Sequence, residues 1–211
     1  MPIPLVYDPP PPDDSSLYQG EILGGVVVYR VLNPPEIVPV AYPLVVVVHN
    51  DCDLAQDHAV RAATAAGQEV DETSRHILPQ VLIAALYEAA LLRDRFAGSE
   101  LRKRGMQNQD ERYHHLDSAT IGNEAGTTPL AEFLIDFRRV QGVPPANLYD
   151  GIQARTITRV ARLPLPFMND LVYRCFTYLG RMGIPDQGIY TAVIPSPAEP
   201  PALPPSSEAT L

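Results

Sequence analysis

Four consecutive valines at residues 45–48, preceded by Leu44, constrain the fold of this chain more than any other stretch. β-branched side chains favour strands, and a short apolar run without polar alternation is typical of a strand buried on both faces. The run ends abruptly in residues 49–53, which read His-Asn-Asp-Cys-Asp. The sequence therefore predicts a central strand that holds a polar cluster at its carboxyl end.

The composition predicts a single domain with proline-rich ends. The chain has 211 residues, of which 45% are hydrophobic, and this suffices for one domain with a core. Its 23 prolines gather towards the two ends. We expect residues 1–16 to be a disordered arm, residues 17–194 to be one domain and residues 195–211 to be a disordered tail.

The chain carries no apolar run long enough to cross a bilayer and no signal segment led by basic residues, which predicts a cytoplasmic protein without a membrane partner. Cys52 and Cys175 lie far apart in dissimilar contexts. We expect both to be reduced thiols and no disulfide to form.

The order of elements predicts an α+β fold. Pro34 and Pro35 fix a turn between strands at residues 20–29 and 38–50, which pair as an antiparallel meander. Further strands are expected at residues 81–87, 112–116, 131–140 and 156–163. Helices are expected at residues 88–95, 100–111 and 166–183, and residues 57–68 form either a surface helix or an insertion. This pattern indicates a small, mostly antiparallel barrel with a helical insertion and a C-terminal amphipathic helix.

Three segments carry a family resemblance. Gly20-Glu21-Ile22 is similar to an opening Gly-Asp-Ile strand, and residues 42–47 (Tyr-Pro-Leu-Val-Val-Val) are similar to an Arg-Pro-Ala-Leu-Val-Leu strand. Residues 135–140 (Ile-Asp-Phe-Arg-Arg-Val), followed by residues 159–163 and a final helix, match a late strand and terminal helix in order. Together they resemble the MazF/PemK family of toxin ribonucleases, and the resemblance implies an SH3-like barrel.

The chain departs from that family at the positions of its catalytic residues. The family's catalytic Arg precedes its Pro-Ala-Leu-Val strand, where this chain has Val40, Ala41 and Tyr42. Its catalytic Thr or Ser follows the next strand, where this chain has residues 85–88 (Ala-Leu-Tyr-Glu). The resemblance therefore implies the barrel and not ribonuclease activity.

Cys52 and Asp53 form the sharpest candidate site, with His49 and Asp51 as binding residues. A thiol beside a histidine is a potential nucleophile. If the strand continued through this cluster, however, His49, Asp51 and Asp53 would lie on one face and Cys52 on the other. The favoured alternative is a buried cysteine at a strand end, with Asp53 accepting backbone N–H bonds in the next turn.

A second candidate site lies at residues 108–114. Arg112 is suited to bind a phosphate or carboxylate and His114 to transfer protons, and both would lie on one strand face. Asn108 and Tyr113 are added as binding residues. The equally weighted alternative is a solvated helix end followed by an edge strand.

Arg138 and Arg139 follow Asp136 in an otherwise apolar strand, so one of them is expected to face inward or to pair with an acid. Arg138 is a candidate binding residue, and the alternative is a structural pair with Asp51 or Asp53.

No metal and no cofactor is predicted. His49, Cys52, His114 and His115 fit no closed Cys/His ligand spacing, and there is no phosphate loop, dinucleotide fingerprint or Gly-x-Ser-x-Gly elbow.

The sequence leaves two functions open. The favoured function is a non-catalytic binding or adaptor module of a bacterial toxin or phage-defence system, with a protein partner and Pro-rich docking arms. The alternative is an endoribonuclease-like enzyme that cleaves RNA with Cys52, Asp53, Arg112 and His114. The net charge of −9 argues against a large nucleic-acid footprint and favours the first.

Overall fold

The computed structural model describes residues 5–69, 77–92, 99–123 and 126–181, and the compact unit Met1–Gly180 contains every element named below. The strands are β1 (Val6–Tyr7), β2 (Glu21–Asn33), β3 (Glu36–Val47), β4 (Val81–Glu88), β5 (Tyr113–Leu116), β6 (Ala119–Asn123), β7 (Gly126–Leu130), β8 (Phe133–Val143) and β9 (Thr158–Arg162). The helices are α1 (Asp51–Ala65), α2 (Ala89–Leu92), α3 (Ser99–Met106), α4 (Pro145–Gln153) and α5 (Leu165–Gly180). The predicted tail, residues 195–211, lies outside the described residues.

The fold is α+β and mostly antiparallel, as the sequence predicts. Six strands form one sheet in the order β5-β8-β4-β3-β2-β9, and every neighbouring pair in it is antiparallel. A second sheet has the order β1-β6-β7, in which β1 runs parallel to β6.

The valine run is a central, fully buried strand, which confirms the prediction. Residues 45–48 are each 0% exposed, and β3 lies between β2 and β4. Val46 and Val48 belong to one hydrophobic cluster and Val45 and Val47 to the other, so alternate side chains fill the two faces of the sheet.

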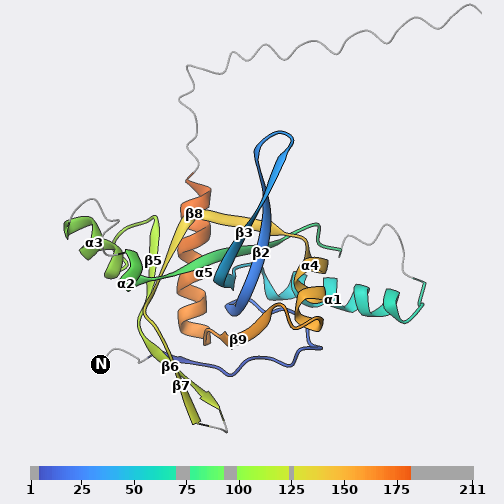
Figure 1. The fold of residues 1–211 in the computed structure, drawn as a ribbon. Coiled ribbons are helices and arrows are strands. Elements are labelled where there is room, and N and C mark those ends of the chain that lie inside the picture. The colour runs from blue at the N-terminus through green and yellow to red at the C-terminus, as the bar shows by residue number, and fades with distance from the viewer. Residues whose placement is uncertain (1–4, 70–76, 93–98, 124–125, 182–211) are drawn as a thin grey trace, which may run out of the picture. The chain divides into compact units, whose positions relative to one another are not determined.

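Helices cover both faces of this sheet. Met168, Leu171 and Cys175 of α5 belong to the cluster on one face. Leu54 of α1 and Leu148 of α4 belong to the cluster on the other face (Figure 1). Within the described ranges, no helix is long and apolar enough to cross a membrane.

The predicted SH3-like barrel is not formed. The six-stranded sheet is open, because its end strands β5 and β9 do not pair with each other. Closure would bury one face of the sheet against itself. Here helices already bury each face of the open sheet, so closure would bury no further apolar face.

The proline-rich arm also differs from its expected disorder, since from Leu5 onwards it packs against the domain. Strand β1 pairs with β6, and Tyr7 is 1% exposed. Leu17 is fully buried, and Ser15 accepts hydrogen bonds from the Arg159 guanidinium through its hydroxyl and its carbonyl oxygen. A few buried anchors therefore hold a segment whose composition alone indicates an unstructured chain.

Several of the remaining elements match the sequence prediction. A strand runs into a short helix at β4 and α2, strands form at β5, β8 and β9, and helix α5 occupies most of residues 166–183. Strands β6 and β7 and helix α4 are absent from the prediction. A further difference lies at residues 51–56, where α1 begins at Asp51 directly after the valine strand. Asn50 is its N-cap, and the Asn50 side chain accepts a hydrogen bond from the Cys52 amide.

Candidate functional site

Strands β2 and β3 extend well beyond the strands beside them. β9 pairs with β2 only at residues 21–24, and β4 pairs with β3 only at residues 45–47. Among the described residues, no third strand pairs with residues 26–42, so this part is a two-stranded hairpin. Figure 1 shows its loop projecting past the other strands.

One side of this hairpin is an exposed apolar surface. Residues that lie directly opposite each other in an antiparallel pair point to the same side of the ribbon. The pairs on this side are Val27 with Ala41, Tyr29 with Pro39, and Val31 with Ile37. All six side chains are exposed, and Tyr29, Val31 and Ile37 are 66%, 61% and 63% exposed. We call this surface the outer face of the hairpin.

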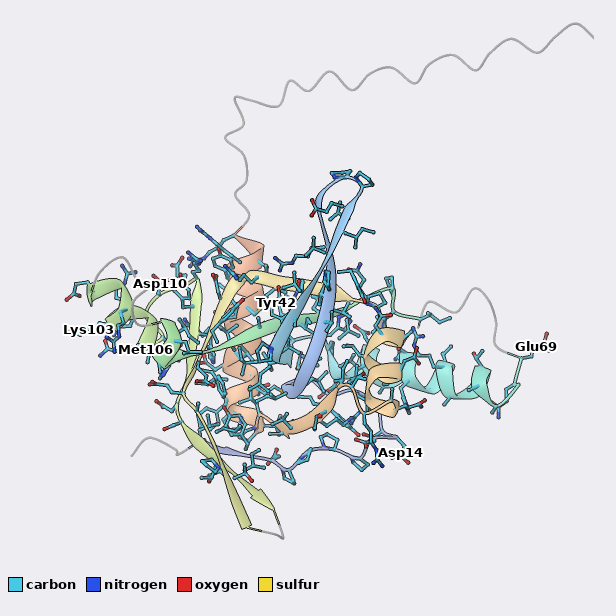
Figure 2. All side chains as sticks on the ribbon, viewed as in Figure 1. Asp14, Tyr42, Glu69, Lys103, Met106 and Asp110 are labelled. Carbon is cyan, nitrogen blue, oxygen red and sulfur yellow. The ribbon has the colours of Figure 1, made fainter. Side chains whose placement is uncertain are left out.

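The opposite side of the hairpin is attached to the sheet. Arg30 donates hydrogen bonds to the Tyr42 hydroxyl, within the hairpin, and to the Gln141 side chain of β8. Tyr42, labelled in Figure 2, is 5% exposed. These contacts fix the orientation of the hairpin and direct its outer face away from the sheet.

Two grooves continue from the outer face across α4. A groove of about 440 Å³ is lined by Val27 and Tyr29 of the hairpin and by Asp150 and Ile157. A second groove of about 590 Å³ lies between α1 and α4, and Asp150 lines it too. The outer face and these two grooves therefore form a connected surface, which we call the hairpin–α4 surface.

The charged residues that line the α1–α4 groove are mostly acidic. Asp13, Asp14 and Asp150 line it, and Asp14 is labelled on the arm in Figure 2. The cation in its lining, Arg61, is paired with the buried carboxylate of Asp57 at 2.7 Å. An acidic groove repels phosphate and attracts lysine or arginine side chains.

The first predicted cluster is not a strand-end site, because Asp51, Cys52 and Asp53 form the first turn of α1. Asp51 accepts hydrogen bonds from the Gln19 amide at 2.6 Å and from Arg162 at 2.9 Å. His49 accepts a hydrogen bond from the Leu82 amide through Nδ1 at 3.4 Å.

His49 pairs with Asp53 and not with the cysteine. Its Nε2 lies 3.8 Å from the Asp53 carboxylate, and burial lowers the pKa of His49 more than Asp53 raises it. Cys52 is exposed, so the favoured alternative of a buried cysteine is wrong. Within the described part of the chain the Cys52 thiol has neither a base nor a buried pocket.

The two cysteines are expected to react very differently. Cys52 is exposed, whereas Cys175 is 0% exposed and burial raises its pKa to about 11. Titration of the native protein with 5,5′-dithiobis(2-nitrobenzoate) should therefore modify one thiol per chain, and titration in denaturant two. A Cys52→Ser variant that still reacts rapidly in the native state would contradict this assignment.

Arg112 is committed to a structural ion pair. It forms a bidentate contact with the Asp136 carboxylate, in which Nε donates at 2.8 Å, and this hydrogen bond raises the pKa of Arg112. Its guanidinium also lies 4.7 Å from the centre of the Tyr113 ring. Arg138 donates a hydrogen bond to the Tyr178 hydroxyl. Arg139 donates to the Tyr87 hydroxyl, and both Arg138 and Arg139 are exposed. The expectation that one of these two arginines faces inward or pairs with an acid is therefore wrong, because among the described residues Asp136 forms its ion pair with Arg112.

His114 and Asn108 do share a cavity. It has a volume of about 300 Å³, and its lining includes Asn108, His114, His115, Asp117 and Asp170. His114 is 2% exposed, and its Nδ1 has no hydrogen-bond partner in the described residues. Burial, with the positive charge of Arg174, lowers the pKa of His114 to about 3. A histidine that stays neutral at physiological pH is a poor general acid there.

The two predicted clusters lie far apart. His49 bonds to Leu82 of β4, whereas His114 of β5 opposes Ile135 of β8, which in turn opposes Leu86 of β4. Four residues along β4 and two strands across the sheet amount to roughly 16 Å. The proposed catalytic set is therefore not assembled.

Comparison with family models, with curated proteins and with solved structures finds no match for this chain.

Proposed function

We propose that this protein is a non-catalytic protein-binding module whose hairpin–α4 surface holds an apolar partner segment flanked by basic residues. The proposal rests on one observation, the exposed apolar outer face of the hairpin. A two-stranded hairpin is marginally stable by itself in water, and contiguous exposed apolar patches commonly mark interaction sites.

The electrostatics favour a protein over a nucleic acid as the partner. The outer face carries no charge, and the α1–α4 groove next to it adds Asp13, Asp14 and Asp150. These carboxylates would repel a phosphate backbone, whereas they complement lysine or arginine beside an apolar segment. The acidic net charge of −9 acts in the same direction.

The alternative of an RNA-cleaving enzyme has less support. Its candidate residues are dispersed: Arg112 is paired with Asp136, His114 is buried and neutral, and Cys52 lies on α1. Only the resemblance of the three sequence segments supports a role in a toxin or phage-defence system. The function that we propose is therefore limited to protein binding.

Selection from a displayed random-peptide library against the full chain tests this proposal. The enriched peptides should combine apolar residues with lysine or arginine. Tyr29→Ser should weaken their binding by about tenfold or more, because truncating a central aromatic anchor typically costs 1–2 kcal/mol or more. Asp150→Asn should weaken binding in a salt-dependent manner.

Tyr173→Ser is the matched control, because Tyr173 is 72% exposed on α5, away from this surface. It should leave the dissociation constants unchanged. Equal affinities for the Tyr29→Ser variant and the wild type would overturn the proposal. So would a library in which no peptide is enriched while RNA binds the chain.

A further inference from the structure

We propose that His115, Asp117 and Glu132 form a binding site for a divalent transition-metal ion such as Zn²⁺ or Mn²⁺. Each residue offers one ligand atom, and these three atoms all lie within 4.8 Å of one another. The site lies at the edge strand β5, so it is separate from the hairpin–α4 surface and independent of the proposed function.

The strand register brings the three side chains together. Leu116 of β5 lies opposite Phe133 of β8, so the next residue on one side, Asp117, meets the preceding residue on the other, Glu132. His115 lies two residues before Asp117 and therefore points to the same side of the strand. Backbone pairing therefore places all three residues on one side of the strand pair.

Hydrogen bonds hold two of the three ligands in place. The Asn108 side chain accepts from the His115 amide at 2.6 Å and donates to the His115 carbonyl at 3.1 Å. Asn108 has a φ of 55°, a left-handed conformation that asparagine tolerates better than most residues. The Glu132 carbonyl accepts a hydrogen bond from the Ala89 amide at 2.9 Å.

The third ligand can adjust to the ion. Ligand atoms that share one tetrahedral ion with bonds of about 2.0–2.2 Å lie roughly 3.3–3.6 Å apart. The Glu132 carboxylate lies 2.8 Å from His115 Nε2, so this contact must open slightly to admit an ion. Asp117 Oδ1 lies 3.9 Å from the other ring nitrogen, Nδ1, so Asp117 must turn towards Nε2 to share the same ion. Asp117 is 83% exposed, so its side chain moves without disturbing the core.

The chemistry of the ligands selects the class of ion. One imidazole with two carboxylates is a mixed nitrogen and oxygen set, which suits Zn²⁺ or Mn²⁺ better than the all-oxygen preference of Ca²⁺. Two carboxylates beside one imidazole also leave negative charge that a divalent cation neutralises.

A second observation points to a polar species at Asp117. The Tyr7 hydroxyl is buried, with the residue 1% exposed, and has no hydrogen-bond partner in the described residues. Burial and the nearby Asp117 carboxylate both raise the pKa of Tyr7. Buried hydroxyls rarely remain unpaired, and a bound ion with its waters beside Asp117 would supply a partner for this one.

The cavity beside the site leaves room for further ligands. His115 and Asp117 line the same cavity of about 300 Å³ as His114 and Asp170. Three protein ligands with an accessible fourth position are typical of zinc sites that bind water or a small ligand.

Isothermal titration of the full chain with ZnCl₂ and with MnCl₂, after removal of metals by a chelator, tests this inference. We expect one ion per chain and a rise in the thermal midpoint on binding. Glu132→Gln and Asp117→Asn should each weaken binding by at least about tenfold. Asp117→Asn changes a solvent-exposed side chain, so it is expected to fold normally.

Asp170→Asn is the matched control, because Asp170 lines the same cavity but lies outside the three-residue set. It should bind the ion with wild-type affinity. Absence of saturable binding by the wild type would overturn the inference. Equal loss in the Asp170 and Asp117 variants would do so as well, because it would indicate diffuse attraction to carboxylates.

Discussion

Glu21→Gln is expected to abolish a loss of stability that the wild type undergoes between pH 4.5 and 7, amounting to up to about 3 kcal/mol. Glu21 is 0% exposed and its carboxylate lies 3.3 Å from Nε of Arg159, which is 5% exposed. Burial raises the pKa of Glu21 from 4.5 to about 7, so between these values the folded state binds more protons than the unfolded state and stability falls as pH rises. Glutamine resembles the protonated carboxyl and does not titrate. Urea denaturation of both proteins at several pH values between 4.5 and 7.5 measures the difference.

Arg159 also holds the N-terminal arm, because it donates hydrogen bonds to the Ser15 and Ser16 carbonyl oxygens at 2.8 and 3.2 Å. Glu36→Gln, at an exposed position of the hairpin, is the control and should change stability by less than about 0.5 kcal/mol. Parallel pH curves for Glu21→Gln and the wild type would contradict the prediction, because they would mean that the Glu21 carboxyl ionises equally easily in the folded and unfolded states.

The companion variant Arg159→Met should behave differently with pH. Burial raises the pKa of Glu21 to about 7 even with Arg159 present, although Arg159 opposes the shift. The folded state thus binds more protons than the unfolded state between the ordinary value of 4.5 and the raised one. Without Arg159 the pKa of Glu21 should rise further, so the fall of stability with rising pH should continue above pH 7.

The sequence predicts the central strand well because burial on both faces leaves a local mark. Valines at residues 45–48 show no alternation, and the structure buries all four. Closure of the sheet into a barrel produces no such pattern in the local sequence. Closure requires β5 and β9 to pair, and the helices that cover each face of the sheet decide whether they do.

The arm could not be predicted for a similar reason. Proline-rich composition indicates disorder, but Tyr7 and Leu17 each fill a buried position and Arg159 binds the backbone at Ser15. Such long-range anchors involve residues more than a hundred positions apart, and composition does not reveal them.

The candidate site was predicted only in part. Asn108 and His114 do line one cavity, but the strand alternation applied to residues 49–53 was wrong because Asn50 caps a helix there. An asparagine followed by Asp51 and Asp53 is itself a helix-start signal, and it could have corrected the assignment. The outer face of the hairpin was missed, since apolar alternation does not reveal which face is covered.

His114→Leu is expected to make the protein markedly more resistant to acid. Burial lowers the pKa of His114 from 6.5 to about 3, so between these values the folded state binds fewer protons than the unfolded state. Wild-type stability is therefore lost as pH falls from 6.5 towards 3, by up to about 4–5 kcal/mol in total. Leucine does not titrate, and it keeps an apolar contact with Phe137, whose ring centre lies 6.3 Å from that of His114.

The groups around His114 support this direction. Arg174 and His115 both oppose a positive charge on the ring, and Asp170, 3.9 Å from Nδ1, is 56% exposed, so solvent weakens its attraction. Denaturation at pH 7, 6, 5 and 4 should give a wild-type curve that falls faster than that of the variant, by at most about 1.4 kcal/mol per pH unit.

The contribution of Glu21 to the pH dependence of stability has the opposite sign and is the same in both proteins. It cancels when the wild-type curve is subtracted from the curve of His114→Leu. His58→Leu makes the same chemical change at a half-buried histidine on α1 and is the control for loss of an imidazole. Parallel curves for His114→Leu and the wild type would mean that His114 is hydrated or paired in the folded state, because only a buried neutral imidazole costs stability on protonation.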